Sequence, residues 1–170
     1  IRSFGECGRF NDGLRYYFNT DSNIENFLKN FLNSSPYIFD KLSKFYINSL
    51  FHKKSKSCLF TDKTLFNFMI LGVLKLSFPK SKFIFLKRNL KDNALSILKN
   101  YFADPYVNFA YDTNDLKMFI KNYKYISSYW LKYIPQDDYI FVDYEKIVND
   151  KKKSIMDILN FLNLSWDESC

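Results

Sequence analysis

The sequence has few of the residues that build metal sites and disulfide frameworks. It contains one histidine and three cysteines, and the cysteines show no CxxC spacing. No familiar zinc-binding pattern can be assembled from these residues, so no metal ion is expected. The odd and sparse cysteine count favours a reducing compartment. We therefore expect the bacterial cytoplasm, with a secretory lumen as the alternative.

Long apolar runs and glycine-rich phosphate-binding motifs are also missing. No apolar run reaches the roughly 18 residues that a membrane-spanning helix needs. The chain has four glycines and no Walker GxxxxGK[ST] element, which a P-loop nucleotide kinase would require. The N-terminal stretch IRSFGECGRF carries neither a start methionine nor a signal-peptide pattern. We expect the chain to start inside a larger protein, which leaves a kinase open as an alternative.

The chain is basic. Its 25 lysines and arginines exceed 18 acidic residues and give a formal net charge of +7. This excess favours an anionic partner, such as a nucleotide, a nucleic acid, a sulfated or phosphorylated ligand, or a membrane surface. A non-catalytic basic module that binds RNA or nucleotide is an alternative, but the lysines are scattered and no RNP-like or zinc-knuckle element occurs. The longest basic run, at Asp150–Ser154, is interpreted as a solvated loop.

Short apolar strands alternate with amphipathic helices along the chain. Strands are expected at Ser57–Lys63, Lys82–Leu86 and Asp138–Glu145. Helices are expected near residues 24–31, 38–50, 66–74, 95–102, 116–130 and 155–162, where apolar side chains recur at helical spacing. This order predicts an α/β fold, in which a parallel sheet is flanked by helices and joined by right-handed crossovers. The clearest loops are residues 104–114 and 136–137.

Polar side chains follow the strand expected at Lys82–Leu86. In open α/β sheets, ligands bind beyond the carboxyl ends of the strands, and Arg88 lies at such an end. Its guanidinium offers a fork of donors suited to phosphate or sulfate. Asn93 is interpreted as the N-cap of the next helix, which would place Ser96 in the first turn beside free backbone N–H groups. The sequence therefore predicts an anion site. The alternative is a surface pair of Arg88 with Asp92 and a merely polar Ser96.

Three further residues mark candidate site positions. Lys63 follows a strand, where its ammonium could neutralise charge on a leaving oxygen; alternatively it is solvated, and Asp62 caps the next helix or pairs with it. Tyr144 follows another strand, where its ring could stack on a base, or it packs in the core. Glu6, between small residues in GECGRF, could act as a general base or be simply solvated.

Taken in order, these elements resemble the sulfotransferases that use 3′-phosphoadenosine-5′-phosphosulfate (PAPS). The likeness is closest to the branch of tyrosylprotein and bacterial TPR-linked sulfotransferases. That branch carries DK.P.N, R.P.D...S and YE.LV elements and a later FL...W, which stand here as DKTLFN, RNLKDNALS, YEKIV and FLNLSW. Order and spacing agree from about Ser57 to Asp167, although Leu65 and Leu90 replace two prolines. GECGRF is similar to the GE element of the family.

The resemblance implies a P-loop-NTPase-like sulfotransferase fold and a role for each candidate residue. Arg88 and Ser96 match the pair that holds the 3′-phosphate of PAPS, and Tyr144 falls near the tyrosine that contacts the adenine. Lys63 matches the lysine near the transferring sulfuryl group. Glu6 matches the glutamate proposed as the base toward the acceptor hydroxyl.

The resemblance also implies an internal piece of a sulfotransferase, cut at both ends. Residues 1–170 would form a single sulfotransferase-like domain without the N-terminal 5′-phosphosulfate loop and the segment beyond Trp166. PAPS would be the cosubstrate, no metal would be needed, and neither a nucleic acid partner nor a membrane span is expected. The acceptor would be a hydroxyl or amine on a protein tyrosine, a carbohydrate or a small molecule. A degenerate domain that transfers nothing is a further alternative, because the phosphate loop is not in this chain.

Overall fold

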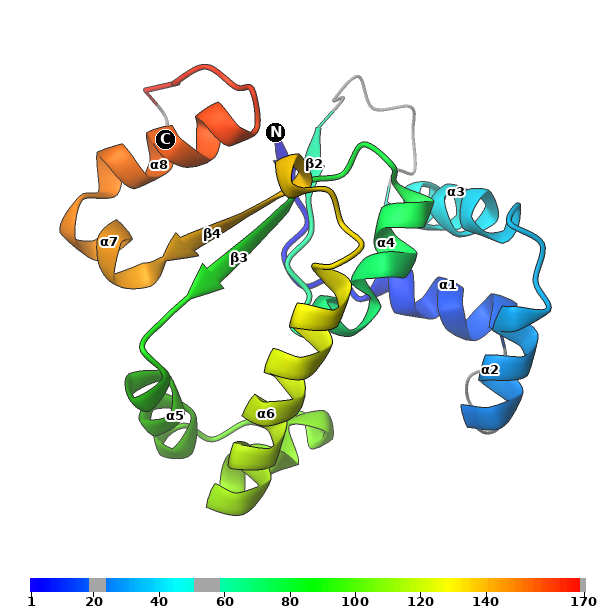
Figure 1. The fold of residues 1–170 in the computed structure, drawn as a ribbon, viewed down its shortest axis with the longest axis horizontal. Coiled ribbons are helices and arrows are strands. Elements are labelled where there is room, and N and C mark those ends of the chain that lie inside the picture. The colour runs from blue at the N-terminus through cyan, green and yellow to red at the C-terminus, as the bar shows by residue number, and fades with distance from the viewer. Residues whose placement is uncertain (19–23, 51–58, 169–170) are drawn as a thin grey trace. The chain divides into compact units, whose positions relative to one another are not determined.

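The computed structural model describes residues 1–18, 24–50 and 59–168 (Figure 1). The described residues have an α/β fold with parallel strands, as expected, but the strands form two separate pairs and helix predominates. The chain divides into two compact units, unit 1 at Ile1–Lys80 and unit 2 at Ser81–Cys170, and each is described by itself. The assignment of residues 1–170 to one domain stays a prediction.

The described residues of unit 1 form one short parallel strand pair and four α-helices. Its elements are β1 (Arg2–Ser3), α1 (Arg9–Phe18), α2 (Ile24–Leu32), α3 (Ile38–Leu50), β2 (Phe60–Thr61), the 3₁₀ helix η1 (Asn67–Ile70) and α4 (Leu71–Ser77). In the parallel pair, Arg2 lies opposite Phe60 and Ser3 lies opposite Thr61. β2 is the described part of the strand expected at Ser57–Lys63, whose first two residues lie outside the described ranges.

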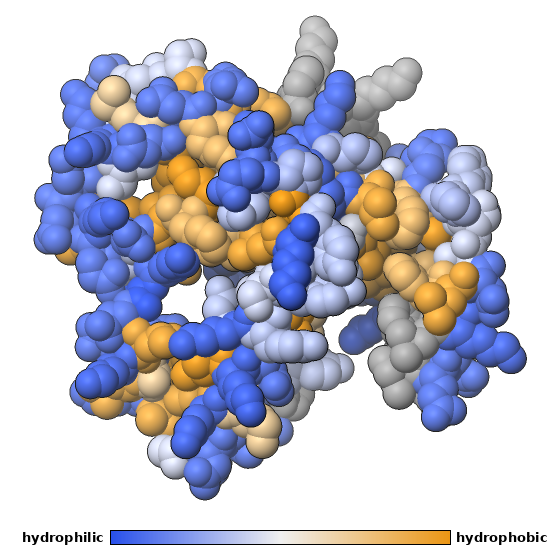
Figure 2. Space-filling model, in the orientation of Figure 1, coloured by the Kyte–Doolittle hydropathy of each residue, from blue (hydrophilic) through white to orange (hydrophobic). Residues whose placement is uncertain are grey.

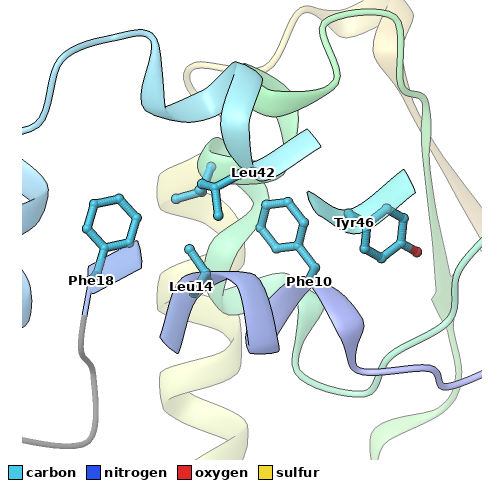
Figure 3. Close-up of a cluster of buried hydrophobic side chains, with 6 residues drawn as sticks. Phe10, Leu14, Phe18, Leu42 and Tyr46 are labelled. Carbon is cyan, nitrogen blue, oxygen red and sulfur yellow. The ribbon is translucent and has the colours of Figure 1, made fainter. Parts of the chain in front are cut away.

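The core of unit 1 lies between α1, α3 and α4. Its buried members are Phe10, Leu14 and Phe18 from α1, Leu42 and Tyr46 from α3, and Val73 from α4 (Figure 3). The spacing of four residues places the α1 side chains on one face of that helix. Gly13 allows a close approach, because a Cβ there would lie 3.0 Å from a ring carbon of Phe45. α3, and with it Tyr46, is therefore firmly packed against α1.

Unit 2 is built around a second parallel strand pair. Its elements are β3 (Phe83–Lys87), α5 (Leu90–Lys99), the 3₁₀ helix η2 (Pro105–Tyr111), α6 (Thr113–Trp130), the 3₁₀ turn η3 (Gln136–Asp138), β4 (Tyr139–Asp143), α7 (Tyr144–Asn149) and α8 (Lys151–Phe161). The parallel ladder runs from Phe83 opposite Tyr139 to Lys87 opposite Asp143. The crossover between the two strands contains α5 and α6, which confirms the expected alternation of strand and helix.

Stretches expected to be loops in unit 2 are largely helical. Residues 104–114 form η2 and the start of α6, and residues 136–137 belong to η3. The basic run at Asp150–Ser154 opens α8, where the Asp150 carboxylate accepts the backbone N–H of Lys153. Aspartate side chains also cap η2 and α6. For residues 104–114 and 150–154 the loop predictions were wrong because these carboxylates satisfy N–H groups that begin helices, whereas η3 has no side-chain cap.

Unit 2 also leaves apolar side chains on its surface. The exposed fractions of Leu90, Leu95 and Leu98 on α5 are 42%, 53% and 40%. Figure 2 shows apolar side chains gathered at the surface over α5 and α6. The apolar face of α5 that the sequence predicts is therefore only partly covered within unit 2.

Candidate functional site

In unit 1, the loops that follow β1 and β2 run side by side. The backbone N–H of Lys63 donates to the carbonyl of Gly5 over 2.8 Å. Gly5 and Gly8 have φ angles of 59° and 62°, in the left-handed region that glycine adopts without a steric penalty. These two turns place Glu6 against the loop after β2.

The side chains of Glu6 and Lys63 meet as an ion pair. The pair is open to solvent, since 77% of the Lys63 side chain and 57% of the Glu6 side chain are exposed. Within the described residues, the partner of Lys63 is thus Glu6 and not Asp62, and Glu6 is more than a solvated loop residue. The two residues that the sequence singled out separately as catalytic candidates lie together.

Asp62 joins three segments of unit 1. Its Oδ2 accepts hydrogen bonds from the Tyr46 hydroxyl at 2.6 Å and from the Cys7 thiol at 3.3 Å, and its Oδ1 accepts one from Thr64 at 2.7 Å. Tyr46 is 3% exposed. Burial, together with the hydrogen bonds to Asp62 and Cys7, raises the pKa of the Tyr46 hydroxyl above its ordinary value. Sequence patterns carry no signal for this cluster, because Cys7 and Asp62 are 55 positions apart.

In unit 2, the register of β3 and β4 brings together the residues that follow them. Lys87 lies opposite Asp143 at the end of the ladder, so Arg88 and Tyr144 leave the sheet as neighbours. The guanidinium carbon of Arg88 lies 5.0 Å from the centroid of the Tyr144 ring. Arg88 is exposed and Tyr144 is 39% exposed. Within the described residues, Arg88 therefore contacts Tyr144 without an ion pair to Asp92, and Tyr144 is not a core residue.

The start of α5 differs from the prediction. The N-cap is Asn89, not Asn93: its Oδ1 accepts the backbone N–H of Lys91 at 2.9 Å and of Asp92 at 3.3 Å. The backbone N–H of Asn89 donates in turn to Glu145 Oε1 over 2.8 Å, which connects the start of α5 to α7. This hydrogen bond lowers the pKa of the Glu145 carboxyl. The helix starts where β3 ends, earlier than the second asparagine.

The position of Ser96 changes accordingly. It lies six positions beyond Leu90, the first residue of α5, or about 9 Å along the helix axis, and not in the first turn. The expected anion site used free backbone N–H groups in a first turn after Asn93. The first turn instead follows Asn89, which already accepts the N–H groups of Lys91 and Asp92, so those two amides are not available for an anion. Ser96 is half-buried and lies seven positions after Asn89. Seven residues make about two turns, so Ser96 lies on the same side of the helix as its cap.

Further charges lie at the ends of the two strands. Lys87 Nζ lies 3.6 Å from the centroid of the Phe141 ring. The Asp143 carboxylate forms an ion pair with Lys146 at 2.9 Å. This contact lowers the pKa of the Asp143 carboxyl and raises the pKa of the Lys146 ammonium. Two cationic residues, Lys87 and Arg88, thus follow one another at the end of β3. The acidic residue at the end of β4, Asp143, is already paired with Lys146.

The five predicted site residues form two groups. Glu6 and Lys63 meet in unit 1, whereas Arg88 and Tyr144 meet in unit 2, with Ser96 further along α5. The convergence of Lys63 and Arg88 on one crevice stays a prediction, because they belong to different units. Their catalytic and binding roles also stay predictions.

Two features are absent from the described ranges. Residues 1–18, 24–50 and 59–168 contain no group of three or more histidine, cysteine, aspartate or glutamate side chains that could hold a metal ion. In the same part of the chain, no helix has the length and apolar character needed to cross a membrane.

The chain is similar in sequence to known proteins. The sequence model of the sulfotransferase family matches residues 19–168, a range that includes Lys63, Arg88, Ser96 and Tyr144 but not Glu6. An uncharacterized protein of Aquifex aeolicus (strain VF5) is 28% identical over 128 residues, which are 74% of this chain. The matched part makes up 17% of that relative, so this chain corresponds to a small share of its length.

Proposed function

The chain belongs to the sulfotransferase family, and from this premise we propose that it moves a sulfuryl group from PAPS to a hydroxyl or amine of an acceptor. The observation that supports this best is the pair of Arg88 and Tyr144, 5.0 Å apart at the end of the parallel ladder. A cation beside an exposed aromatic ring fits a ligand that joins a phosphate to a purine base. We assign the chain a P-loop-NTPase-like fold and the tyrosylprotein or TPR-linked branch, on the elements DKTLFN, RNLKDNALS and YEKIV.

The chemistry of the unit 2 residues fits the nucleotide end of PAPS. Arg88 would bind the 3′-phosphate through the two parallel donors of its guanidinium. Ser96 would add a hydroxyl donor from the second turn of α5, on the side of the helix that carries its cap. Tyr144 would offer its ring to the adenine. The backbone N–H groups of Lys91 and Asp92 already donate to Asn89. The side chains of Arg88 and Ser96, and not the N-terminus of α5, would therefore bind the phosphate.

The residues of unit 1 suit the transfer step. Bound PAPS supplies an activated sulfuryl group, whose S–O bond to the 5′-phosphate breaks in line as the acceptor oxygen bonds to sulfur. Glu6 would take the proton of the acceptor hydroxyl. Lys63 would stabilise the negative charge left on the phosphate oxygen. Their ion pair keeps carboxylate and ammonium within reach of one reacting centre, so the protein would contribute mainly positioning and charge.

Several kinds of acceptor fit the proposed reaction. A protein tyrosine, a carbohydrate or a small molecule would each offer the required hydroxyl or amine, and the scheme needs no metal and no nucleic acid. The sparse, odd cysteine count supports the bacterial cytoplasm ahead of a secretory lumen as the compartment.

A ligand comparison tests the donor assignment. The purified protein is titrated by calorimetry with 3′,5′-diphosphoadenosine, with ATP and magnesium, and with single-stranded RNA at two salt concentrations. We expect the bisphosphate to bind most tightly. A preference for ATP with magnesium would indicate a kinase, and salt-dependent RNA binding without bisphosphate binding would indicate a binding module. Bisphosphate binding without sulfuryl transfer from PAPS to any acceptor would indicate a degenerate domain.

A further inference from the structure

The cluster around Asp62 connects the two loops that carry the Glu6–Lys63 pair. Asp62 precedes Lys63 in the chain, and its Oδ2 accepts the thiol of Cys7, which follows Glu6. We propose that Asp62 is the positioning residue that holds Glu6 and Lys63 against each other, an inference that rests on the proposed function. One carboxylate would thus set the spacing of the groups that face the acceptor and the leaving oxygen.

The ion pair cannot hold the two loops by itself. Both of its side chains are largely exposed, and water competes for exposed charges, so such pairs contribute little. The backbone bond from Lys63 N–H to Gly5 joins the loops at one point. The hydrogen bond from Cys7 to Asp62 joins the same two loops at a second point. Both residues are half-buried, so this bond is less exposed to water than the ion pair.

Tyr46 gives this link a rigid base. Its hydroxyl donates to Asp62 Oδ2 over 2.6 Å, the shorter of the two hydrogen bonds to that oxygen. Its ring is packed at centroid distances of 5.9 Å from Phe10 and 5.6 Å from Phe78. Figure 3 shows the Tyr46 oxygen on the side of the ring that points away from Phe10. The core therefore fixes the position of the ring. The hydroxyl in turn fixes Asp62, which contacts both loops.

The chemistry of the cluster calls for a carboxylate at position 62. Asp62 Oδ2 accepts two donors and Oδ1 accepts a third from Thr64, so both oxygens act as acceptors. An asparagine amide has only one acceptor oxygen. Its NH₂ group would face a thiol or hydroxyl group that donates to Asp62 in the wild type. The raised pKa of Tyr46 agrees with a hydroxyl that remains a donor at neutral pH.

Conservative variants separate this role from general stability. Tyr46→Phe keeps the buried ring and removes only its hydroxyl, and Asp62→Asn keeps the size of the side chain. Cys7→Ala removes a donor that Cys7→Ser restores. Tyr17→Phe, on α1 of the same unit but outside the cluster, is the matched control.

Two readouts are needed. Hydrogen exchange of the Lys63 amide, followed by NMR, reports whether the loops stay in register, since this amide donates to Gly5. We expect it to exchange about 10-fold faster in Tyr46→Phe, Asp62→Asn and Cys7→Ala. Turnover of PAPS should fall about 10-fold in the same variants while KM for PAPS changes less than about twofold, because the donor is held elsewhere. Cys7→Ser and Tyr17→Phe should behave like the wild type.

Each contrary result is decisive. Faster exchange of the Lys63 amide with unchanged turnover would show that Asp62 only stabilises the loops, and unchanged exchange would show that it does not hold them. An equal loss in Tyr17→Phe would point to general destabilisation. Each of these outcomes overturns the proposal. If the wild type binds no bisphosphate and transfers no sulfuryl group, the proposed function fails, and the exchange of the Lys63 amide alone decides whether Asp62 sets the register.

Discussion

Replacing Asn89 by alanine removes the side chain that caps α5. Its Oδ1 accepts the N–H groups of Lys91 and Asp92, and in the variant both groups are left to water. Loss of an N-cap costs about 0.5–2 kcal/mol of the free energy of unfolding. Lys91 and Asp92 are exposed, so water can hydrate their amides, and we expect a loss of about 1 kcal/mol. The hydrogen bond between the backbone of residue 89 and Glu145 does not depend on the side chain and should persist.

Asn93 provides a matched control, because it is the same residue type one turn further along α5. Asn93→Ala should leave the stability unchanged or raise it by up to about 0.5 kcal/mol, since alanine is the better helix former. Asn89→Asp keeps a capping oxygen and should retain the wild-type stability.

Urea unfolding followed by circular dichroism measures these differences. With a slope m of about 2 kcal/mol/M, a loss of 1 kcal/mol lowers the midpoint by about 0.5 M. Asn89→Ala should show this shift without a change in m. If Asn93→Ala is the more damaging substitution, α5 starts at the second asparagine and the capping argument is refuted.

Two further predictions concern the same region. Leu90→Pro should be neutral or stabilise by about 0.4–1 kcal/mol, because proline suits the first residue of a helix. Leu95→Pro, in the helix interior, should lower the free energy of unfolding by about 3 kcal/mol or more. If Leu90→Pro and Leu95→Pro lower the midpoint of thermal unfolding equally, α5 does not start at Leu90. The lowered pKa of Glu145 means that its contribution to stability is present above the ordinary glutamate pKa of about 4.3 and is lost as pH falls through the lowered value. The free energy of unfolding, measured with urea, should therefore fall less between pH 7 and pH 3 in Glu145→Gln than in the wild type. An equal fall in both proteins would refute the role given to the hydrogen bond between the Asn89 N–H and Glu145.

The strands of unit 2 and most helices could be predicted because their signals are local. The strand expected at Lys82–Leu86 is β3 at Phe83–Lys87, and the strand expected at Asp138–Glu145 contains β4. α1 had not been expected, although Phe10, Leu14 and Phe18 recur at a spacing of four and would have indicated it.

The start of α5 could not be predicted from local pattern alone. Asn89 and Asn93 are both good N-cap residues. The choice between them depends on where β3 ends and on Glu145, which is 56 positions away. The first-turn position of Ser96 was an error that followed directly from choosing Asn93.

Contacts in the candidate site depend on the tertiary fold in the same way. Glu6 and Lys63 were each selected for their chemistry, but their ion pair spans 57 positions. The strands that align their loops, β1 and β2, are each two residues long; β2 lies within a stretch that the sequence predicted as a strand, whereas β1 is too short for an apolar pattern. The hydrogen bonds of Asp62 to Cys7 and Tyr46 appear only once these strands pair and α3 packs on α1.

Arg88 carries the central claim, that this chain binds an adenosine with a phosphate on its 3′-oxygen. Calorimetric Kd values for 3′,5′-diphosphoadenosine and 5′-AMP should be compared in the wild type, Arg88→Ala and Lys99→Ala. The last variant removes the same charge from the far end of α5. We predict that Arg88→Ala weakens bisphosphate binding about 10- to 150-fold, weakens 5′-AMP binding far less, and that Lys99→Ala changes neither appreciably. Equal weakening for both nucleotides, or no weakening at all, would contradict the claim.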